Sequence, residues 1–240
     1  AVSLRCDLRI TCCVCLILLL AWIIWAIPVQ AQNTDSSVLK IKAAYDGKTG
    51  TGTAFYVHPN ILATSYHVIQ GSPQITAYIN DFPVQITKIL EFAPDMDLAL
   101  IYTPFQGPPL ELGHADLEPK DKLVCMGFPQ GSSLKKVQAI FYSWEKINNV
   151  WHLCMQGQVQ PGMSGGPVLD GHNRVVGVNT LGFYEKDFSF GRAVSVNNVR
   201  KLLDQVLHSI EFIGVDTFAS QTSIEPQLRV QDNQIVITDE

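Results

Sequence analysis

The sequence predicts an all-β fold that ends in a C-terminal helix. The chain has 240 residues, 47% of them hydrophobic, and an all-β unit of two packed barrels can reach roughly 200–250 residues. Beyond residue 38, short apolar runs alternate with turn residues, as in strands joined by tight turns. Residues 196–210 instead place their apolar side chains on one helical face. A series of strands followed by one helix is therefore expected.

A first barrel is expected over about residues 38–103. Its apolar runs are separated by segments of typical turn residues, namely residues 46–47, 58–60, 71–73 and 80–81. Prolines and a glycine then gather in residues 104–119, which predicts a linker between two halves.

A second barrel is expected over about residues 122–196. Residues 137–146 and 150–155 form a predicted hairpin around Asn148 and Asn149, because asparagine tolerates the positive φ of tight hairpin turns. The helix that follows is expected over about 197–210, with Asn197 or Asn198 as its N-cap.

The last residues, 216–240, form an acidic tail. Residues 228–230 and 235–238 alternate around Asp232 and Asn233, which is compatible with a small hairpin packed on the barrel. A disordered end explains the same composition. The sequence leaves both possibilities open.

Residues 1–31 are interpreted as a targeting segment. Arg5 and Arg9 precede an uncharged run at 10–27, and the small residues of Val-Gln-Ala at 29–31 fit a signal-peptidase site. The alternative is a retained membrane anchor, because the apolar run reaches the lower limit for a spanning helix. Under either interpretation the remaining chain is expected in the periplasm or outside the cell, and residues 10–27 are a possible membrane tether.

Composition argues against several classes of function. The formal net charge is −5 and no basic patch occurs, so nucleic-acid binding is not expected. Neither a phosphate-binding glycine loop nor metal-ligand spacing is present, so we expect no cofactor and no metal. Four of the six cysteines lie in the targeting segment. The other two, Cys125 and Cys154, could form a disulfide or remain as two buried thiols.

Residues 161–167 carry the strongest chemical signal of the chain. They read Pro-Gly-Met-Ser-Gly-Gly-Pro, with Ser164 between glycines in a turn that has a proline at each end. Glycine permits positive φ and close approach to a ligand, so the turn can direct the N–H groups of Gly162 and Ser164 at one oxyanion. An ordinary Gly/Pro turn is the alternative. Esterases of another fold share Gly-x-Ser-x-Gly, but there a helix follows the serine, whereas residues 167–169 continue as a strand.

Two further segments supply partners for this serine. His67 follows a short predicted strand at 61–64, and Asp97 opens an apolar strand in Asp-Leu-Ala-Leu. A carboxylate at the start of a buried strand needs a hydrogen-bond donor, and a histidine N–H is one. Asp95 lies two residues earlier and is the competing carboxylate. The expected roles are nucleophile for Ser164, base for His67 and orienting acid for Asp97.

With these motifs the chain resembles trypsin-like serine proteases of the chymotrypsin fold, and among them the bacterial Deg/HtrA-type protease domain. The resemblance runs from about residue 38 to 207. Its matching segments are residues 50–55, 64–68, 97–100, 127–131, 161–168 and 176–180. It implies two six-stranded antiparallel Greek-key barrels, a catalytic cleft between them and a closing C-terminal helix.

The resemblance also implies a function. The chain would be an exported serine endopeptidase that cleaves peptides or unfolded proteins through an acyl-enzyme, with an oxyanion hole at Gly162, Met163 and Ser164. The implied substrate pocket consists of Gln158, Thr180, Leu181 and Gly182, with Gly191 and Arg192 near its far wall. Because no carboxylate occupies position 158, an uncharged P1 residue is expected.

Two residues depart from the family pattern. Met163 stands where aspartate often precedes the nucleophile, so activation by an inserted N-terminal amine is not expected. Tyr66 replaces a small residue before the histidine and is expected to reshape the cleft. No PDZ-like domain follows within the chain. The alternative to an active protease is a latent or non-catalytic peptide-binding or quality-control module on the same fold. The oligomeric state is left open.

Overall fold

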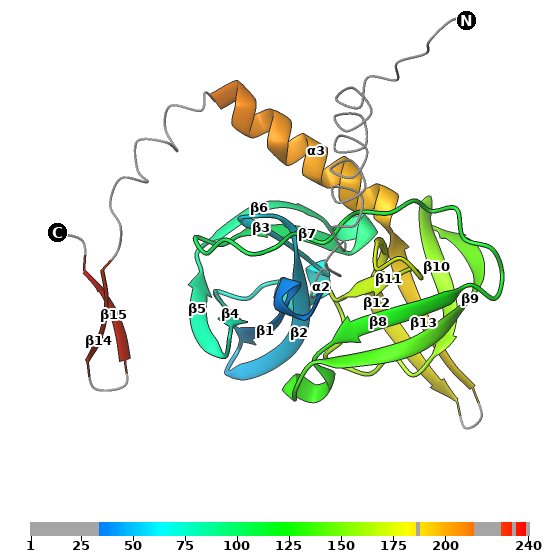
Figure 1. Cartoon of the computed structure of the whole chain (residues 1–240), viewed down its shortest axis with the longest axis horizontal. Helices are drawn as coiled ribbons and strands as arrows, with labels where there is room; N and C mark the ends of the chain where they lie inside the picture. Colours follow the sequence, from blue (N-terminus) through cyan, green and yellow to red (C-terminus); the bar gives the residue numbers. More distant parts are fainter. Residues whose placement is uncertain (1–33, 186–187, 214–226, 232–233, 239–240) are drawn as a thin grey trace, which may run out of the picture. The chain divides into compact units, whose positions relative to one another are not determined.

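Seven strands of the first half form one antiparallel sheet in the order β5-β4-β1-β2-β3-β7-β6 (Figure 1). The computed structural model describes residues 34–185, 188–213, 227–231 and 234–238. The strands are β1 (Val38–Tyr45), β2 (Lys48–His58), β3 (Ile61–Thr64), β4 (Gln74–Ile79), β5 (Phe82–Ile86), β6 (Lys88–Ala93) and β7 (Leu98–Tyr102). Short helices lie at η1 (Thr34–Ser37), α2 (Tyr66–Ile69) and η2 (Pro94–Met96).

This first sheet has one strand more than the six expected and leaves two edges. Strands β5 and β6 are its outer strands, and no described ladder joins them. Both are mostly exposed, with Phe82, Ile89 and Phe92 facing solvent. Weakly apolar strands of this kind give little periodic signal, so their number could not be counted from the sequence.

The second half is a closed barrel of six antiparallel strands, in the order β10-β13-β12-β11-β8-β9. The strands are β8 (Lys122–Gly127), β9 (Lys135–Ile147), β10 (Val150–Gly157), β11 (Pro167–Leu169), β12 (Val175–Glu185) and β13 (Phe188–Ser195), with η3 (Pro129–Gly131) between β8 and β9. The predicted hairpin is β9–β10, and Asn148 and Asn149 have φ of 48° and 68° at its turn. These positive values explain the two asparagines.

Three apolar clusters form the core. One fills the first sheet and includes Ile41, Leu62 and Ile101, and another fills the barrel and includes Leu123 and Met155. The third joins residues of both halves to helix α3 (Val196–Ile213). The helix contributes the apolar face expected from the sequence, namely Val199, Leu202, Leu203, Val206 and Leu207. The helix therefore packs against both halves at once (Figure 1).

Helix α3 begins one residue earlier than expected, which changes its N-cap. Ser195 precedes the helix, and its hydroxyl oxygen accepts the backbone N–H of Asn197 at 3.3 Å. The prediction of Asn197 or Asn198 as the cap was therefore wrong, since both lie within the first turn. Val196 is the first residue of the helix and is fully buried.

Both described cysteines are free thiols. Cys125 on β8 faces the barrel interior with its sulfur 3.4 Å from that of Met155, and burial raises the pKa of the Cys125 thiol to about 12. Cys154 on β10 lies instead beside Glu145 and Arg192. Neither thiol is bonded to the other, which answers the question left open by the sequence.

The C-terminal segment contains an antiparallel hairpin of β14 (Gln227–Gln231) and β15 (Gln234–Thr238), in which Gln231 pairs with Gln234. The predicted targeting segment, residues 1–31, lies outside the described residues. Within the described part of the chain, no helix combines the length and the apolar character needed to cross a membrane.

Candidate active site

The ends of two neighbouring strands bring His67 and Asp97 together. Strands β3 and β7 pair antiparallel with Thr64 opposite Ala99, so the residues just after β3 lie beside those just before β7. His67 lies in the single turn α2, directly after β3, and Asp97 follows η2. Asp97 has a φ of 50°, a left-handed conformation that aspartate adopts more readily than most residues.

Both oxygens of the Asp97 carboxylate are bound by His67. The backbone N–H of His67 donates to Oδ1 at 2.9 Å, and the ring Nδ1 lies 2.7 Å from Oδ2. The Tyr66 N–H also donates to the Asp97 carbonyl at 3.1 Å. An ionised carboxylate can only accept, so Nδ1 carries the proton and Nε2 of a neutral ring presents a lone pair.

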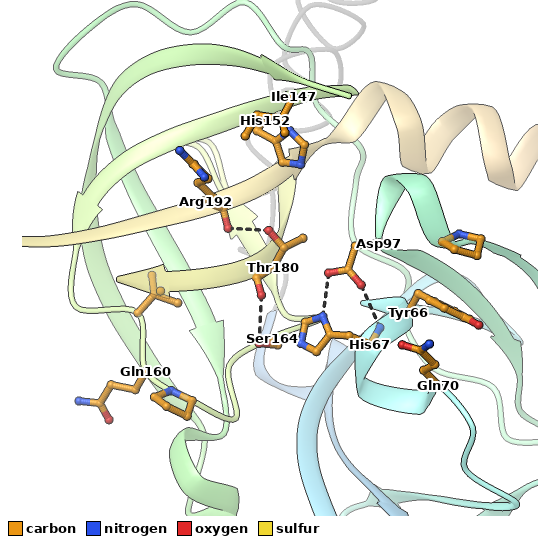
Figure 2. A pocket seen from close by; sticks show the side chains of 14 residues that line it. Tyr66, His67, Gln70, Asp97, Ile147, His152, Gln160, Ser164, Thr180 and Arg192 are labelled. Atoms are coloured by element: carbon orange, nitrogen blue, oxygen red, sulfur yellow. Dashed lines mark hydrogen bonds and ion pairs between the residues drawn. The ribbon is translucent and has the colours of Figure 1, made fainter. Parts of the chain in front are cut away.

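Ser164 lines the same cleft as this pair but on the other half of the molecule. The cleft has a volume of about 700 Å³, and Figure 2 shows Ser164 beside the imidazole ring of His67. The Ser164 hydroxyl donates to the Thr180 carbonyl at 3.4 Å, a long bond. No bond between Ser164 and His67 occurs among the described residues. Catalytic hydrogen bonds are often long or poorly aligned without substrate, so the lack of this bond does not argue against a pairing of Ser164 with His67.

All four carbonyl groups of the turn at residues 161–164 are bound. Pro161 accepts from the Gln130 N–H at 2.8 Å, and Gly162 accepts from the Thr53 hydroxyl at 2.8 Å. Met163 accepts from the Gly166 N–H at 3.0 Å, and Ser164 accepts from the Thr53 N–H at 2.8 Å. The orientation of each peptide group is therefore fixed.

The N–H groups of the turn are not all hydrogen-bonded, unlike its carbonyl groups. Met163 donates to the Gln160 carbonyl at 3.0 Å, whereas the N–H groups of Gly162 and Ser164 have no acceptor among the described residues. In a trans peptide the C=O and N–H point in opposite directions, so the Gly162 N–H points away from Gln130. Two backbone donors, the N–H groups of Gly162 and Ser164, are thus open in the turn that carries the Ser164 hydroxyl.

Glycine is required at position 162. Its φ is +95°, and an added Cβ would collide with the Phe128 carbonyl oxygen and lie 2.7 Å from the Gln130 nitrogen. Backbone atoms cannot move aside as a flexible side chain can. The close approach of the turn to the residues after β8 therefore depends on the missing side chain.

Met163 anchors the turn by apolar contact. Its side chain is fully buried in the barrel cluster that includes Val159 and Val168. No charged partner faces it in that cluster. The turn is therefore held by burial of this side chain and by backbone bonds.

The predicted pocket residues are partly brought together. Thr180, Gly182 and Arg192 line the cleft, but Gln158 is exposed and does not. Gly191 is buried against Val159 and Met155 rather than lining the cleft. The Leu181 side chain lies outside the described part of the chain. The wall assigned to Gln158 is formed instead by the next residues along the chain, namely Val159, Gln160 and Pro161.

Several lining residues were not named as pocket residues from the sequence. These are Pro94 and, labelled in Figure 2, Gln70, Ile147 and His152. Pro94 could have been suspected because it lies three residues before Asp97, but nothing in the sequence indicates His152. Tyr66 does line the cleft and stacks on Phe92, with ring centroids 5.3 Å apart and an interplanar angle of 13°.

The cleft carries one described carboxylate, that of Asp97. Arg192 forms an ion pair with Glu145 at 2.8 Å on the barrel side. Burial lowers the pKa of His152. A hydrogen bond to the Val150 carbonyl raises this pKa, and the nearby Arg192 cation lowers it. The ring of His152 is therefore neutral at neutral pH. Among the described lining residues, no negative group other than Asp97 is placed to receive a substrate cation.

Known proteins with similar sequences are serine proteases. The profile of the trypsin-like peptidase domain family matches residues 52–178. The serine protease Rv3671c of Mycobacterium tuberculosis is 29% identical over 166 residues, which cover 63% of this chain and 41% of that protein. A probable periplasmic serine endoprotease, DegP-like, of a Marinomonas species is 27% identical over 181 residues, covering 70% of this chain and 39% of that protein. The chain thus spans less than half the length of these relatives.

Solved structures share the architecture. The crystal structure of the M. tuberculosis Rv3671c protease in its active form matches with a TM-score of 0.67 and 25% identity, over 75% of this chain and 86% of that one. The HtrA-type protease AlgW with a tripeptide matches with a TM-score of 0.64 and 22% identity, over 75% and 62% of the two chains. The predicted two-barrel fold and the resemblance to Deg/HtrA-type protease domains are confirmed.

Proposed function

Because the chain belongs to the trypsin-like peptidase domain family, we propose that it is a serine endopeptidase that uses Ser164, His67 and Asp97. The observation that carries the proposal is the His67–Asp97 pair, bonded at 2.7 Å, in one cleft with Ser164. The matching relatives named serine proteases support the same activity.

The proposed reaction is acyl transfer to Ser164 and then to water. His67 Nε2 takes the Ser164 proton as Oγ attacks the scissile carbonyl, and then gives it to the leaving amine. Water, deprotonated by the same ring, hydrolyses the acyl-enzyme and releases Ser164. Asp97 keeps the proton on Nδ1 and stabilises the imidazolium. The substrates are peptides or unfolded proteins.

The proposed oxyanion hole consists of the N–H groups of Gly162 and Ser164. Their lack of acceptors, together with the four bound carbonyls of the turn, supports a hole that is formed before substrate binds. Of the residues first proposed for the hole, Met163 contributes no N–H, since its own is bound to Gln160. Met163 acts instead as the apolar anchor of the turn.

Labelling with a fluorophosphonate tests the nucleophile and its base directly. The full chain should be labelled, while Ser164→Ala should not be and His67→Ala should be labelled at least about 100-fold more slowly. Circular dichroism establishes that each variant is folded. A folded wild-type chain that takes no label would contradict the proposal and favour the alternative of a latent or non-catalytic binding module.

Gly162→Ala is expected to lower kcat by at least about 100-fold, the usual effect of losing one oxyanion donor. The new methyl group would meet the backbone of Phe128 and Gln130 and turn the peptide. Steady-state kinetics on a peptide ester measure the effect. The matched control is Gly171→Ala, because nothing lies within 4 Å of a Cβ at that exposed glycine. Equal rates for the two variants would argue against the proposed hole.

We expect a preference for an uncharged P1 residue. The proposed pocket contains Val159, Thr180 and Gly182 and has the Arg192 cation nearby. Among the described lining residues the one carboxylate is that of Asp97, which is bound to His67. Peptides with alanine or valine at P1 should show kcat/KM at least about 10-fold above the arginine peptide. A series of peptides that differ only at P1 measures this, and faster cleavage after arginine would refute the pocket assignment.

The proposed location is the periplasm or the cell exterior. Residues 1–31 support export through their basic residues, their apolar run and the Val-Gln-Ala site. The Marinomonas relative, a probable periplasmic endoprotease, supports the same location. Fractionation followed by N-terminal sequencing distinguishes cleavage after Ala31 from a retained tether at residues 10–27. Recovery of the intact chain in the cytoplasm would contradict export.

A further inference from the structure

Thr53 is the residue that binds the serine turn from the opposite half of the molecule. It lies on β2 and is fully buried. Its hydroxyl donates to the Gly162 carbonyl at 2.8 Å and accepts the Phe128 N–H at 3.1 Å. Its own N–H donates to the Ser164 carbonyl at 2.8 Å. One threonine therefore supplies two of the four bonds that hold the carbonyls of the turn.

The hydroxyl also connects the turn to the loop after β8. Phe128, whose N–H the hydroxyl accepts, directly precedes η3, and Gln130 within η3 holds the Pro161 carbonyl at 2.8 Å. The loop and the turn are thus bound to each other at two points, and Thr53 is the side chain at one of them. If the loop shifts, the Pro161 carbonyl loses its donor, and the Pro161–Gly162 peptide becomes free to rotate.

The surroundings of the hydroxyl leave no room for a substitute. A Cβ on Gly127 would lie 2.9 Å from Thr53 Oγ1, and a Cβ on Gly166 would lie 3.1 Å from its methyl carbon. A water molecule could not enter without moving this backbone. Valine would therefore leave the Gly162 carbonyl and the Phe128 N–H without partners.

We propose that Thr53 is a positioning residue for the oxyanion hole. It touches no reacting atom. It fixes the peptide groups that contain the Gly162 and Ser164 carbonyls, and these groups adjoin the two N–H groups, of Gly162 and Ser164, that bind the oxyanion. This role rests on the proposed function. Because the oxyanion develops only in the transition state, loss of the hydroxyl lowers kcat and leaves KM nearly unchanged.

The test compares Thr53→Val, Thr53→Ser and Thr103→Val in the full chain. Thr53→Val should lower kcat by about 10- to 100-fold, less than outright removal of a donor, with KM within about twofold. Its inhibition by a peptide aldehyde, whose adduct places an oxygen in the hole, should weaken by a similar factor. Thr53→Ser keeps the hydroxyl and should restore kcat to within about threefold of wild type.

Thr103→Val is the matched control. Thr103 is equally buried, and its hydroxyl also accepts a backbone N–H, that of Phe105 at 3.3 Å, but it lies outside the cleft. Its loss should affect stability without changing aldehyde inhibition. Equal kcat in Thr53→Val and Thr103→Val would overturn the proposal. If Thr53→Val does not fold, Thr53→Ala removes the same hydroxyl with less steric demand and gives the same comparison.

Amide hydrogen exchange tests the same inference without any turnover. In Thr53→Val the N–H groups of Phe128 and Gln130 should exchange at least about 10-fold faster, while those of strand β12 keep their wild-type rates. Unchanged exchange at both amides would overturn the positioning role. A wild-type chain without peptidase activity would contradict the proposed function, and the exchange rates would still decide whether Thr53 fixes the turn.

Discussion

Replacing Asp97 by asparagine is expected to lower kcat about 10⁴-fold with little change in KM. The carboxylate accepts from the His67 backbone N–H at 2.9 Å and from ring Nδ1 at 2.7 Å. Asparagine keeps the first bond through its carbonyl oxygen, but its NH₂ group then faces Nδ1. Nδ1 must become an acceptor, so the ring proton moves to Nε2 and prevents removal of the Ser164 proton.

Asp95→Asn is the matched control for this prediction. Asp95 is two residues earlier, exposed and outside the cleft lining, and the change in charge is the same. Its kcat should stay within about twofold of wild type, as for surface substitutions in general. Steady-state kinetics on one peptide ester, with circular dichroism of each variant, measure both. A similar loss in the two variants would refute the assignment of Asp97 as the orienting acid.

Replacing Met163 by aspartate should destabilise the fold by about 4 kcal/mol or more at neutral pH, the upper range for single substitutions. The side chain is fully buried in the apolar cluster of the barrel, with the Gln160 N–H as its one polar neighbour among the described hydrogen bonds, so an ionised group is strongly disfavoured there. This loss is a large part of the roughly 5–15 kcal/mol that stabilises a typical domain. Introducing the aspartate that the resemblance associates with this position is therefore expected to destabilise this chain.

The pH dependence separates charge from shape in this variant. Burial raises the pKa of the introduced carboxyl above its unfolded value of about 3.9, so the variant loses stability as pH rises through that interval. Denaturant unfolding should show a smaller deficit near pH 4 than near pH 8. Met163→Asn serves as the neutral control, with a deficit that does not change with pH, and Met163→Leu should cost less than about 1.5 kcal/mol. A deficit of Met163→Asp that is the same at both pH values would contradict the burial of this position.

The three residues proposed as the triad could be selected from the sequence because each lies in a distinctive local string. The serine turn needs glycine at fixed positions, and the Asp-Leu-Ala-Leu string selected Asp97, whose carboxylate is indeed the one that binds His67. The pocket was less predictable, because spacing does not determine which way a loop side chain points. Gln158 faces solvent, while its neighbour Val159 is buried and lines the cleft.

The role of Thr53 could not be predicted from the sequence. A threonine in a strand is a common choice for packing alone. The partners of its hydroxyl, Phe128 and Gly162, are 75 and 109 residues away in the chain, so only the folded arrangement brings them together. The seven-stranded first sheet illustrates the same limit, since its outer strands carry few buried residues and gave no clear period.

Ser164, the proposed nucleophile, is itself part of the joint between the two halves. The Ser164 carbonyl accepts from Thr53 across that joint, and the Ser65 hydroxyl donates across it to Asn179 at 2.9 Å. The halves therefore cannot separate without displacing the serine from its base, even if every strand of each half stays intact. The proposed peptidase activity therefore depends on how the two halves are docked against each other.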